Sequence, residues 1–139
     1  MLRAATSLIS AAIQTEVEDT FKKATQKSFD YFKDEDLDRY WKACGRWGNP
    51  SHGNIKSLFF RIGFVDVLDG LSWQKFRNAS IVRTLDNINE VRNRVVHGQP
   101  LTIGGKGIRL TKPLVVTWQN FGTVFVKKFP EHVFRQYEE

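Results

Sequence analysis

The feature that most constrains the fold is an apolar periodicity at the start of the chain. Within residues 2–31, apolar residues recur at three- and four-residue steps, which is one face of a long helix: Leu2, Ala5, Ile9, Ile13, Val17 and Phe21. Glu16, Glu18 and Asp19 continue the same pattern. A signal peptide would not contain these carboxylates, so we expect a helix of the folded domain.

Length and composition predict one domain over residues 1–139. With 41% hydrophobic and 26% charged residues, the chain is typical of a globular protein with an aromatic-rich core. The single cysteine, Cys44, excludes an internal disulfide and suits the reducing cytoplasm. No apolar run approaches the roughly 20 residues that span a bilayer, so we expect no membrane partner.

Turn residues divide the middle of the chain. Four of them predict a loop after residue 44, namely Gly45, Gly48, Pro50 and Gly53. Ser51 or Asn54 can cap the helix that follows, "IKSLFFRIGFVDVL", which Gly70 ends.

The C-terminal third predicts one hairpin and one helix. The segment "LTIGGKGIRL", residues 101–110, is typical of a small hairpin with a glycine-rich turn. Residues 115–129 place Trp118, Phe121 and Phe125 on one helical face, although their Val and Phe content also permits a strand. Pro130 is expected to interrupt this element. The whole chain thus predicts an all-α bundle of four or five helices, with the hairpin inserted before the last helix.

The segment "NEVRNRVVHGQP" ends a helix that we predict over about residues 80–97. Ser80 can cap its start, and Gly98 and Pro100 close it. On a helical wheel its apolar residues form one stripe, comprising Ile81, Leu85, Ile88, Val95 and Val96. Arg92 falls near the middle of that stripe. A guanidinium there is costly unless it is paired or reaches a cleft, so a role for Arg92 is expected.

Three residues of this helix form a set with chemical potential. Asn93 and His97 are four residues apart and share another side of the helix. Arg92, Asn93 and His97 supply a cation for a phosphate, an amide for orientation and an imidazole that can transfer protons. This set suits RNA cleavage in which the 2′-hydroxyl attacks the adjacent phosphorus, without a metal or another cofactor.

The same residues also have structural interpretations. His97 could simply cap the helix, and Arg92 could form an ion pair with Asp19 or Asp86. Chance supplies roughly 0.2 Arg-x4-His pairs in a chain of this composition, and about 0.01 when Asn must follow the arginine. The spacing alone is therefore a weak motif, and the asparagine makes it stronger. Glu90 and Arg94, on the opposite side, are expected to be solvated surface.

The segment "RNRVVHG" resembles the RNxxxHG form of the Rx4–6H motif of HEPN domains. The N-terminal helix, "NPSHGNIKSLFFRIGF", Trp73 and the motif helix follow in an order similar to the RiboL-PSP branch of that family, over roughly residues 2–100. The resemblance implies a small helical bundle in which Arg92 and His97 are catalytic and Asn93 is the polar position after the arginine.

The resemblance also implies a function and partners. Many HEPN domains are metal-independent endoribonucleases of toxin–antitoxin or phage-defence systems, and they act as homodimers with a composite active site. An antitoxin protein is a further implied partner. Some members carry a tyrosine that a nucleotidyltransferase antitoxin modifies, and that position is Gln99 here. Other members have lost activity and bind RNA or a partner protein, which is the alternative function.

The charge of the chain favours RNA as a partner. A net charge of +6 and a pI near 9.6 suit an acidic ligand, although a solvated basic surface gives the same values. Arg46, Trp47 and His52 could contact RNA, with Trp47 as a stacking face, or could belong to a plain capping loop. Lys127 and Lys128 could follow the RNA backbone. No group of residues has metal-ligand spacing, so we expect no metal.

Overall fold

Helices dominate the computed structural model, which describes residues 1–138. The elements follow in the order α1 (Leu2–Ser28), α2 (Asp34–Cys44), α3 (His52–Phe60), α4 (Asn78–Val96), β1 (Thr102–Ile103), β2 (Lys106–Gly107), α5 (Lys112–Arg135) and the 3-10 turn η1 (Gln136–Glu138). The predicted all-α fold, with five helices and a hairpin after the motif helix α4, is confirmed for this part of the chain. Within it, no helix is both long and apolar enough to cross a membrane.

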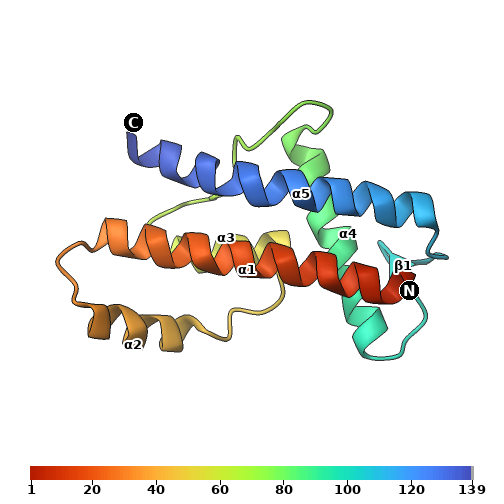
Figure 1. The fold of residues 1–139 in the computed structure, drawn as a ribbon, viewed down its shortest axis with the longest axis horizontal. Coiled ribbons are helices and arrows are strands. Elements are labelled where there is room, and N and C mark those ends of the chain that lie inside the picture. The colour runs from red at the N-terminus through yellow and green to blue at the C-terminus, as the bar shows by residue number, and fades with distance from the viewer. Residues whose placement is uncertain (139) are drawn as a thin grey trace.

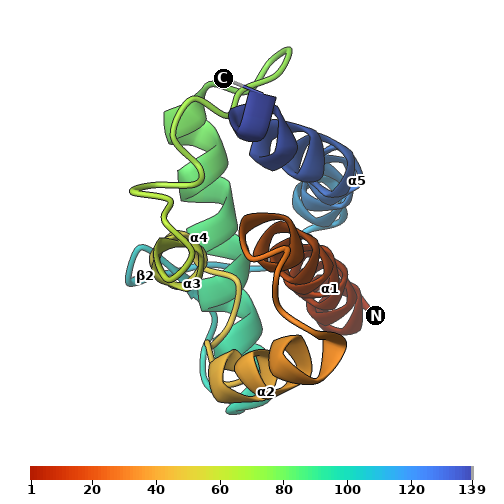
Figure 2. The ribbon, with the colours of Figure 1, turned by 90° about the vertical axis from the view of Figure 1, so that its left-hand side faces the viewer.

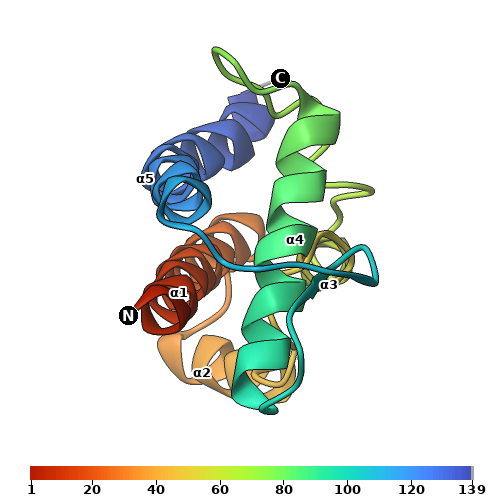
Figure 3. The ribbon, with the colours of Figure 1, turned by 90° about the vertical axis from the view of Figure 1, so that its right-hand side faces the viewer.

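Two long helices, α1 and α5, lie side by side, and α4 crosses them (Figure 1). Figures 2 and 3, turned to either side, show α5 beside the N-terminal half of α4. The hairpin packs on the C-terminal half of α4 through Glu90, whereas α2 packs on α1 and lies well away from α4 in Figure 1. The short helix α3 packs against both α1 and α4, and the rings of Phe21 on α1 and Phe59 on α3 meet edge to face at 5.3 Å. The two ends of α4 therefore have different neighbours.

Close packing of α1 on α5 builds the core. A Cβ on Gly122 would lie 3.3 Å from Ile9 Cγ2, so only glycine allows the two helices to come this near without a shift. On α5, an aromatic residue recurs every four positions, at Phe121, Phe125 and Phe129. The ring centroids of the first two lie 5.9 Å apart and those of the last two 5.1 Å apart. All three rings are buried, as the predicted aromatic face of a helix requires.

Pro130 lies inside α5, so the prediction that it would interrupt this helix is wrong. The helix runs from residue 112 to 135 instead of 115 to 129. Proline removes one backbone hydrogen bond and crowds the preceding turn. Phe129 and Val133 are fully buried on either side of it, and their packing favours the continued helix over a break.

The helix after the glycine-rich loop is shorter than predicted. Ser51 caps α3 as expected, with its Oγ accepting the Asn54 N–H at 3.2 Å. The helix ends at Phe60, well before Gly70, and Gly63 adopts a φ of 103° just beyond it. A left-handed glycine reverses the chain there, so the apolar residues that follow pack as an irregular segment.

The motif helix α4 begins two residues before its predicted start. Arg77, not Ser80, occupies the N-cap position. Asn78 anchors the first turn, since its Nδ2 donates to the carbonyl oxygens of Leu68 at 2.6 Å and Leu71 at 3.0 Å. A side chain that ties the helix to the preceding segment replaces the expected serine cap.

Candidate active site

The apolar stripe of α4 changes direction before it reaches Arg92. Ile81, Leu85 and Ile88 are buried as predicted, but the next buried residue is Val91. Val96, predicted to belong to the stripe, is 55% exposed. The core lies on the side of α4 that carries Val91, where this helix packs against α1 and α3. Arg92 is therefore half-buried at the edge of the core rather than within it.

Two asparagines hold the guanidinium of Arg92. Its Nη1 donates to Asn49 Oδ1 at 3.0 Å and to Asn93 Oδ1 at 3.2 Å. Asn49 Nδ2 in turn donates to Asn93 Oδ1 at 2.7 Å, which closes a three-residue cluster. We call Asn49, Arg92 and Asn93 the amide cluster.

Among residues 1–138, no carboxylate forms an ion pair with Arg92, and the two ion pairs found there join other residues. The alternative prediction of an ion pair with Asp19 or Asp86 is wrong, because Asp86 Oδ1 accepts the backbone N–H of His52 instead, at 2.8 Å. Amide oxygens fix the guanidinium without cancelling its charge. Arg92 thus keeps a full positive charge in a half-buried position.

The amide cluster also leaves donors free. Within the described residues, Arg92 uses only Nη1, and its Nε and Nη2 make no hydrogen bond. Asn93 accepts twice through Oδ1, while its Nδ2 donates to no protein group there. A planar fork of N–H groups beside a free amide donor matches the oxygens of a phosphate diester.

A second polar group lies on the same flank of α4. Asn89 Oδ1, one turn before Asn93, is buried and has no hydrogen-bond donor in this part of the chain. A buried carbonyl without a partner is uncommon away from functional sites. This end of the helix is therefore more polar than folding alone requires.

Asn49 is the residue that the sequence did not single out. Its loop is anchored on both sides, because Asn54 Nδ2 donates to the Asn49 carbonyl at 2.8 Å and Trp47 Nε1 donates to Glu18 Oε1 at 3.1 Å. Gly48 has a φ of 100°, and a Cβ there would lie 2.7 Å from Asn54 Nδ2. The sequence feature that could have indicated Asn49 is the "GNP" triplet, in which the glycine and the proline set the backbone conformation around the asparagine.

His97 ends α4 and is exposed. It occupies the C-cap position with φ −91° and ψ 7°, and its backbone N–H donates to the Asn93 carbonyl at 3.1 Å. Its imidazole makes no hydrogen bond within residues 1–138. Asn93 is hydrogen-bonded to Arg92, and His97 lies one helical turn beyond Asn93, so we expect the imidazole to lie near the amide cluster at this end of α4.

The predicted stacking role of Trp47 is wrong. The side chain is only 8% exposed, and its Nε1 is bonded to Glu18, so neither ring face is open to a base. His52 begins α3 and lies 3.7 Å from Asp66 through its Nε2, which gives it a structural partner. Arg46 is exposed next to this loop and stays a candidate RNA contact.

Lys127 and Lys128 lie apart from the amide cluster. Lys127 is exposed and Lys128 half-buried on α5, which passes the N-terminal half of α4, whereas Arg92 is near the C-terminal end of α4 (Figures 1 and 2). Lys128 Nζ also lies 3.8 Å from Glu131 Oε2. The structure therefore does not bring these lysines to the same site as Arg92.

Glu90 is not the free surface residue that we expected. Its carboxylate accepts hydrogen bonds from the Thr102 hydroxyl and from the backbone N–H groups of Gly104, at 2.9 Å, and Gly105, at 3.2 Å. The Thr102 hydrogen bond, followed by those two N–H groups, lowers the pKa of Glu90. This clasp fixes the hairpin against α4 one turn before Arg94.

Residues 1–138 contain no group of three His, Cys, Asp or Glu side chains arranged to hold a metal ion. No family model, curated protein or solved structure matches the chain.

Proposed function

We propose that the protein is a metal-independent endoribonuclease with a HEPN-like fold, which acts in the cytoplasm as a toxin or anti-phage defence effector. The observation that best supports this proposal is the charge state of Arg92. A half-buried cation held by two neutral amides has no structural ion pair to make, yet its fork of donors is kept in one orientation. Such an arrangement favours a ligand that carries phosphate.

In the proposed reaction, the 2′-oxygen of a nucleotide attacks the adjacent phosphorus. Arg92 stabilises the charge that develops on the phosphoryl oxygens, and the free Nδ2 of Asn93 orients one of them. His97 accepts the proton of the 2′-hydroxyl, and a second proton goes to the 5′-oxygen as its bond to phosphorus breaks. The products are a 2′,3′-cyclic phosphate and a 5′-hydroxyl.

A homodimer would supply both proton transfers. One chain offers one histidine at this site, whereas a two-fold dimer through the end of α4 would bring two copies of His97 to one cleft. Light scattering at tens of micromolar protein checks the proposed dimer: a strictly monomeric mass with RNA cleavage intact would rule out a shared site.

Incubation of end-labelled RNA with the protein in EDTA tests the proposed activity. We expect fragments with 2′,3′-cyclic phosphate ends from the natural chain. His97→Ala should lower the cleavage rate by about 10²- to 10⁴-fold, the usual contribution of a general acid or base. Because His97 is exposed, this variant should unfold at the same denaturant concentration as the parent. Equal cleavage by both chains would reject the assignment of His97.

A catalytically silent module that binds RNA or a partner protein is the second candidate. It is favoured by one observation, namely that no group among residues 1–138 orients the His97 imidazole. This alternative predicts RNA binding that survives His97→Ala and no fragments from the natural chain.

The cellular role has its own test. Expression in a bacterial host should slow growth, and His97→Ala should relieve the effect. An antitoxin, if one exists, would then be found as a protein that restores growth of cells that express the natural chain. Equal growth with both chains would argue against the toxin role.

A further inference from the structure

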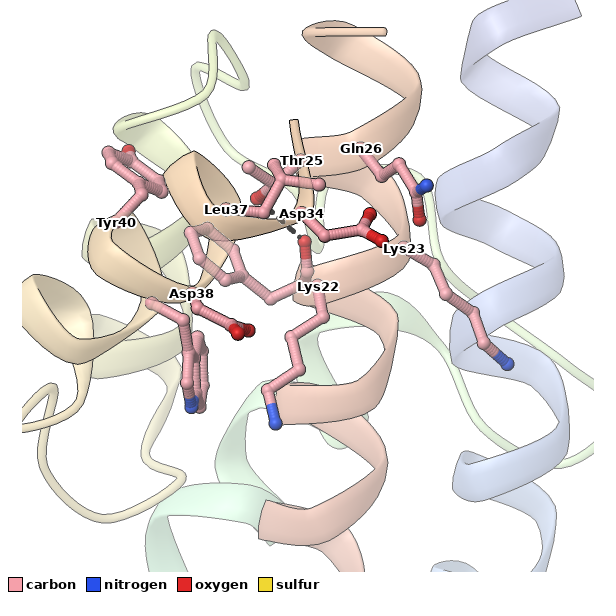
Figure 4. A pocket seen from close by; sticks show the side chains of 10 residues that line it. Lys22, Lys23, Thr25, Gln26, Asp34, Leu37, Asp38 and Tyr40 are labelled. Carbon is pink, nitrogen blue, oxygen red and sulfur yellow. Dashed lines mark hydrogen bonds between the residues drawn. The ribbon is translucent and has the colours of Figure 1, made fainter. Parts of the chain in front are cut away.

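A pocket of about 430 Å³ lies between α1 and α2, away from the amide cluster. Figure 4 shows its side chains, which come from the last two turns of α1 and from α2. Its lining combines aromatic rings with charges of both signs: Phe21, Lys22, Lys23, Thr25, Gln26, Asp34, Leu37, Asp38, Tyr40 and Trp41. This mixture suits a flat ligand that is polar at its edge.

Aromatic side chains form the floor of the pocket. The Phe21 ring lies 5.8 Å from Trp41 and 6.3 Å from Tyr40, measured between ring centroids. The outer face of Trp41 is covered by its own neighbour, since Lys22 Nζ lies 4.5 Å from the ring centroid. A lysine in this position is held weakly, and a stacking ligand can displace it.

Four charged side chains surround this floor without pairing. Asp34 and Asp38 extend from α2 toward α1, which carries Lys22 and Lys23 (Figure 4). None of the four belongs to an ion pair among residues 1–138. Asp34 also stabilises the first turn of α2, but Asp38 lies one turn later and has no such role. The pocket thus offers carboxylate acceptors on one wall and two lysines on the other, of which Lys22 is held only by the Trp41 ring.

We propose that this pocket binds the guanine base of a guanosine nucleotide, either free or within RNA. The base stacks on Trp41, its N1–H and exocyclic amino group donate to a carboxylate of α2, and the displaced Lys22, with Lys23, contacts the phosphate. Adenine offers an acceptor at N1, which a carboxylate repels. A basic peptide fits less well, because the two lysines and the net charge of +6 oppose it.

One RNA chain can reach both the pocket and the amide cluster. Trp47 is bonded to Glu18, one helical turn before Lys22, and Asn49 follows Trp47 by two residues. The two sites are therefore separated by roughly 30 Å or less, a distance of several nucleotides. If the proposed ribonuclease function holds, the pocket would select a guanosine near the scissile phosphate.

Titration of the whole protein with guanosine monophosphate and adenosine monophosphate tests the pocket directly. We expect quenching of tryptophan fluorescence and at least tenfold tighter binding of the guanosine nucleotide, the order of a good bidentate contact. Asp38→Asn should reduce that preference to less than threefold. Glu35→Gln, an exposed acid on the same helix outside the pocket, should leave it unchanged.

Trp41→Leu gives the second variant, and it should weaken guanosine monophosphate binding about tenfold through loss of stacking. Equal affinity for the two nucleotides, a basic peptide that binds in their place, or binding that ignores both Asp38→Asn and Trp41→Leu would overturn the proposal. Asp38→Asn lies on the pocket wall and not in the core, so its result stands even if Trp41→Leu unfolds.

A labelled RNA with a single guanosine separates the two sources of the ligand. Cleavage clustered near that guanosine, and scattered in Asp38→Asn, would identify the RNA-bound form. Cleavage without nucleotide preference, together with no binding of guanosine monophosphate, rejects the pocket and leaves the ribonuclease in place. Binding of guanosine monophosphate without cleavage keeps the pocket and rejects the ribonuclease.

Discussion

The two ends of α4 differ in what they contribute. Its N-terminal turns bury Ile81, Leu85 and Ile88 against the core, which is what the apolar stripe requires. Its C-terminal turns carry Arg92 and Asn93 in hydrogen bonds to a loop asparagine, with an unneutralised charge and free donors. One half of the helix fits a structural role alone, while the other half keeps polar groups that folding does not explain.

This difference predicts which substitutions in α4 should change stability and which should change activity. Substitutions in the first half should change the free energy of unfolding and leave the chemistry of folded molecules intact. Substitutions in the amide cluster should do the opposite, because its hydrogen bonds are partly exposed and each contributes little net stability.

The largest stability change is expected from Leu85→Ala. Leu85 is fully buried, so truncation leaves a cavity and should lower the free energy of unfolding by about 2–5 kcal/mol. Urea unfolding measures it, and RNA cleavage per folded molecule should not change. A loss of cleavage without a loss of stability would contradict the division of the helix.

Asn49→Asp tests the role of Arg92 at the C-terminal end of α4. The substitution places a carboxylate 3.0 Å from Arg92 Nη1, where the amide oxygen now lies. The free energy of unfolding should change by no more than about 1 kcal/mol, because the half-buried ion pair gained is offset by loss of the hydrogen bond from Asn49 Nδ2 to Asn93 Oδ1. RNA cleavage should fall about 10- to 100-fold, because the cation is neutralised.

If Arg92 had only a structural role, Asn49→Asp would alter stability alone. Unchanged cleavage is thus the outcome that would favour the structural interpretation. Ser57→Asp, at an exposed position of the neighbouring helix α3, is the matched control for an added negative charge.

The smallest effect is expected from Glu90→Gln, which weakens the clasp on the hairpin. The folded pKa of Glu90 is lowered from about 4.5, so its charged form stabilises the fold above that value. This contribution is lost as pH falls through the folded pKa. At pH 7 the variant should be about 1 kcal/mol less stable, and the two chains should converge once the pH falls below the lowered pKa of Glu90. An equal difference at both pH values would exclude the carboxylate as the cause.

Much of the fold could be predicted because it depends on periodic patterns. The spacing of apolar residues predicts α1 and the buried face of α4, and the aromatic spacing predicts α5. The continuation of α5 through Pro130 could not be predicted, since it depends on the burial of Phe129 and Val133 by residues far away in the sequence.

The site was predictable only in part, for a related reason. Arg92 stands out because it interrupts an apolar stripe, and Asn93 and His97 follow from helical spacing. The role of Asn49 depends on a contact 43 residues apart in sequence, which no local pattern records. The burial of Trp47 could not be predicted, because the sequence around a loop residue does not determine how exposed its side chain is. Here the Trp47 Nε1 donates to Glu18 Oε1, which holds the ring in the core.

The rate of RNA cleavage by Arg92→Ala tests most directly the claim that a free, fixed cation serves a phosphate. Arg83→Ala, an exposed arginine on the same helix, is the matched control for lost charge. In EDTA, with equal amounts of folded protein, Arg92→Ala should cleave about 10²- to 10³-fold more slowly than the natural chain, while Arg83→Ala should cleave at nearly the natural rate. Equal rates for the two variants would contradict the account, whether both are fast or both are slow.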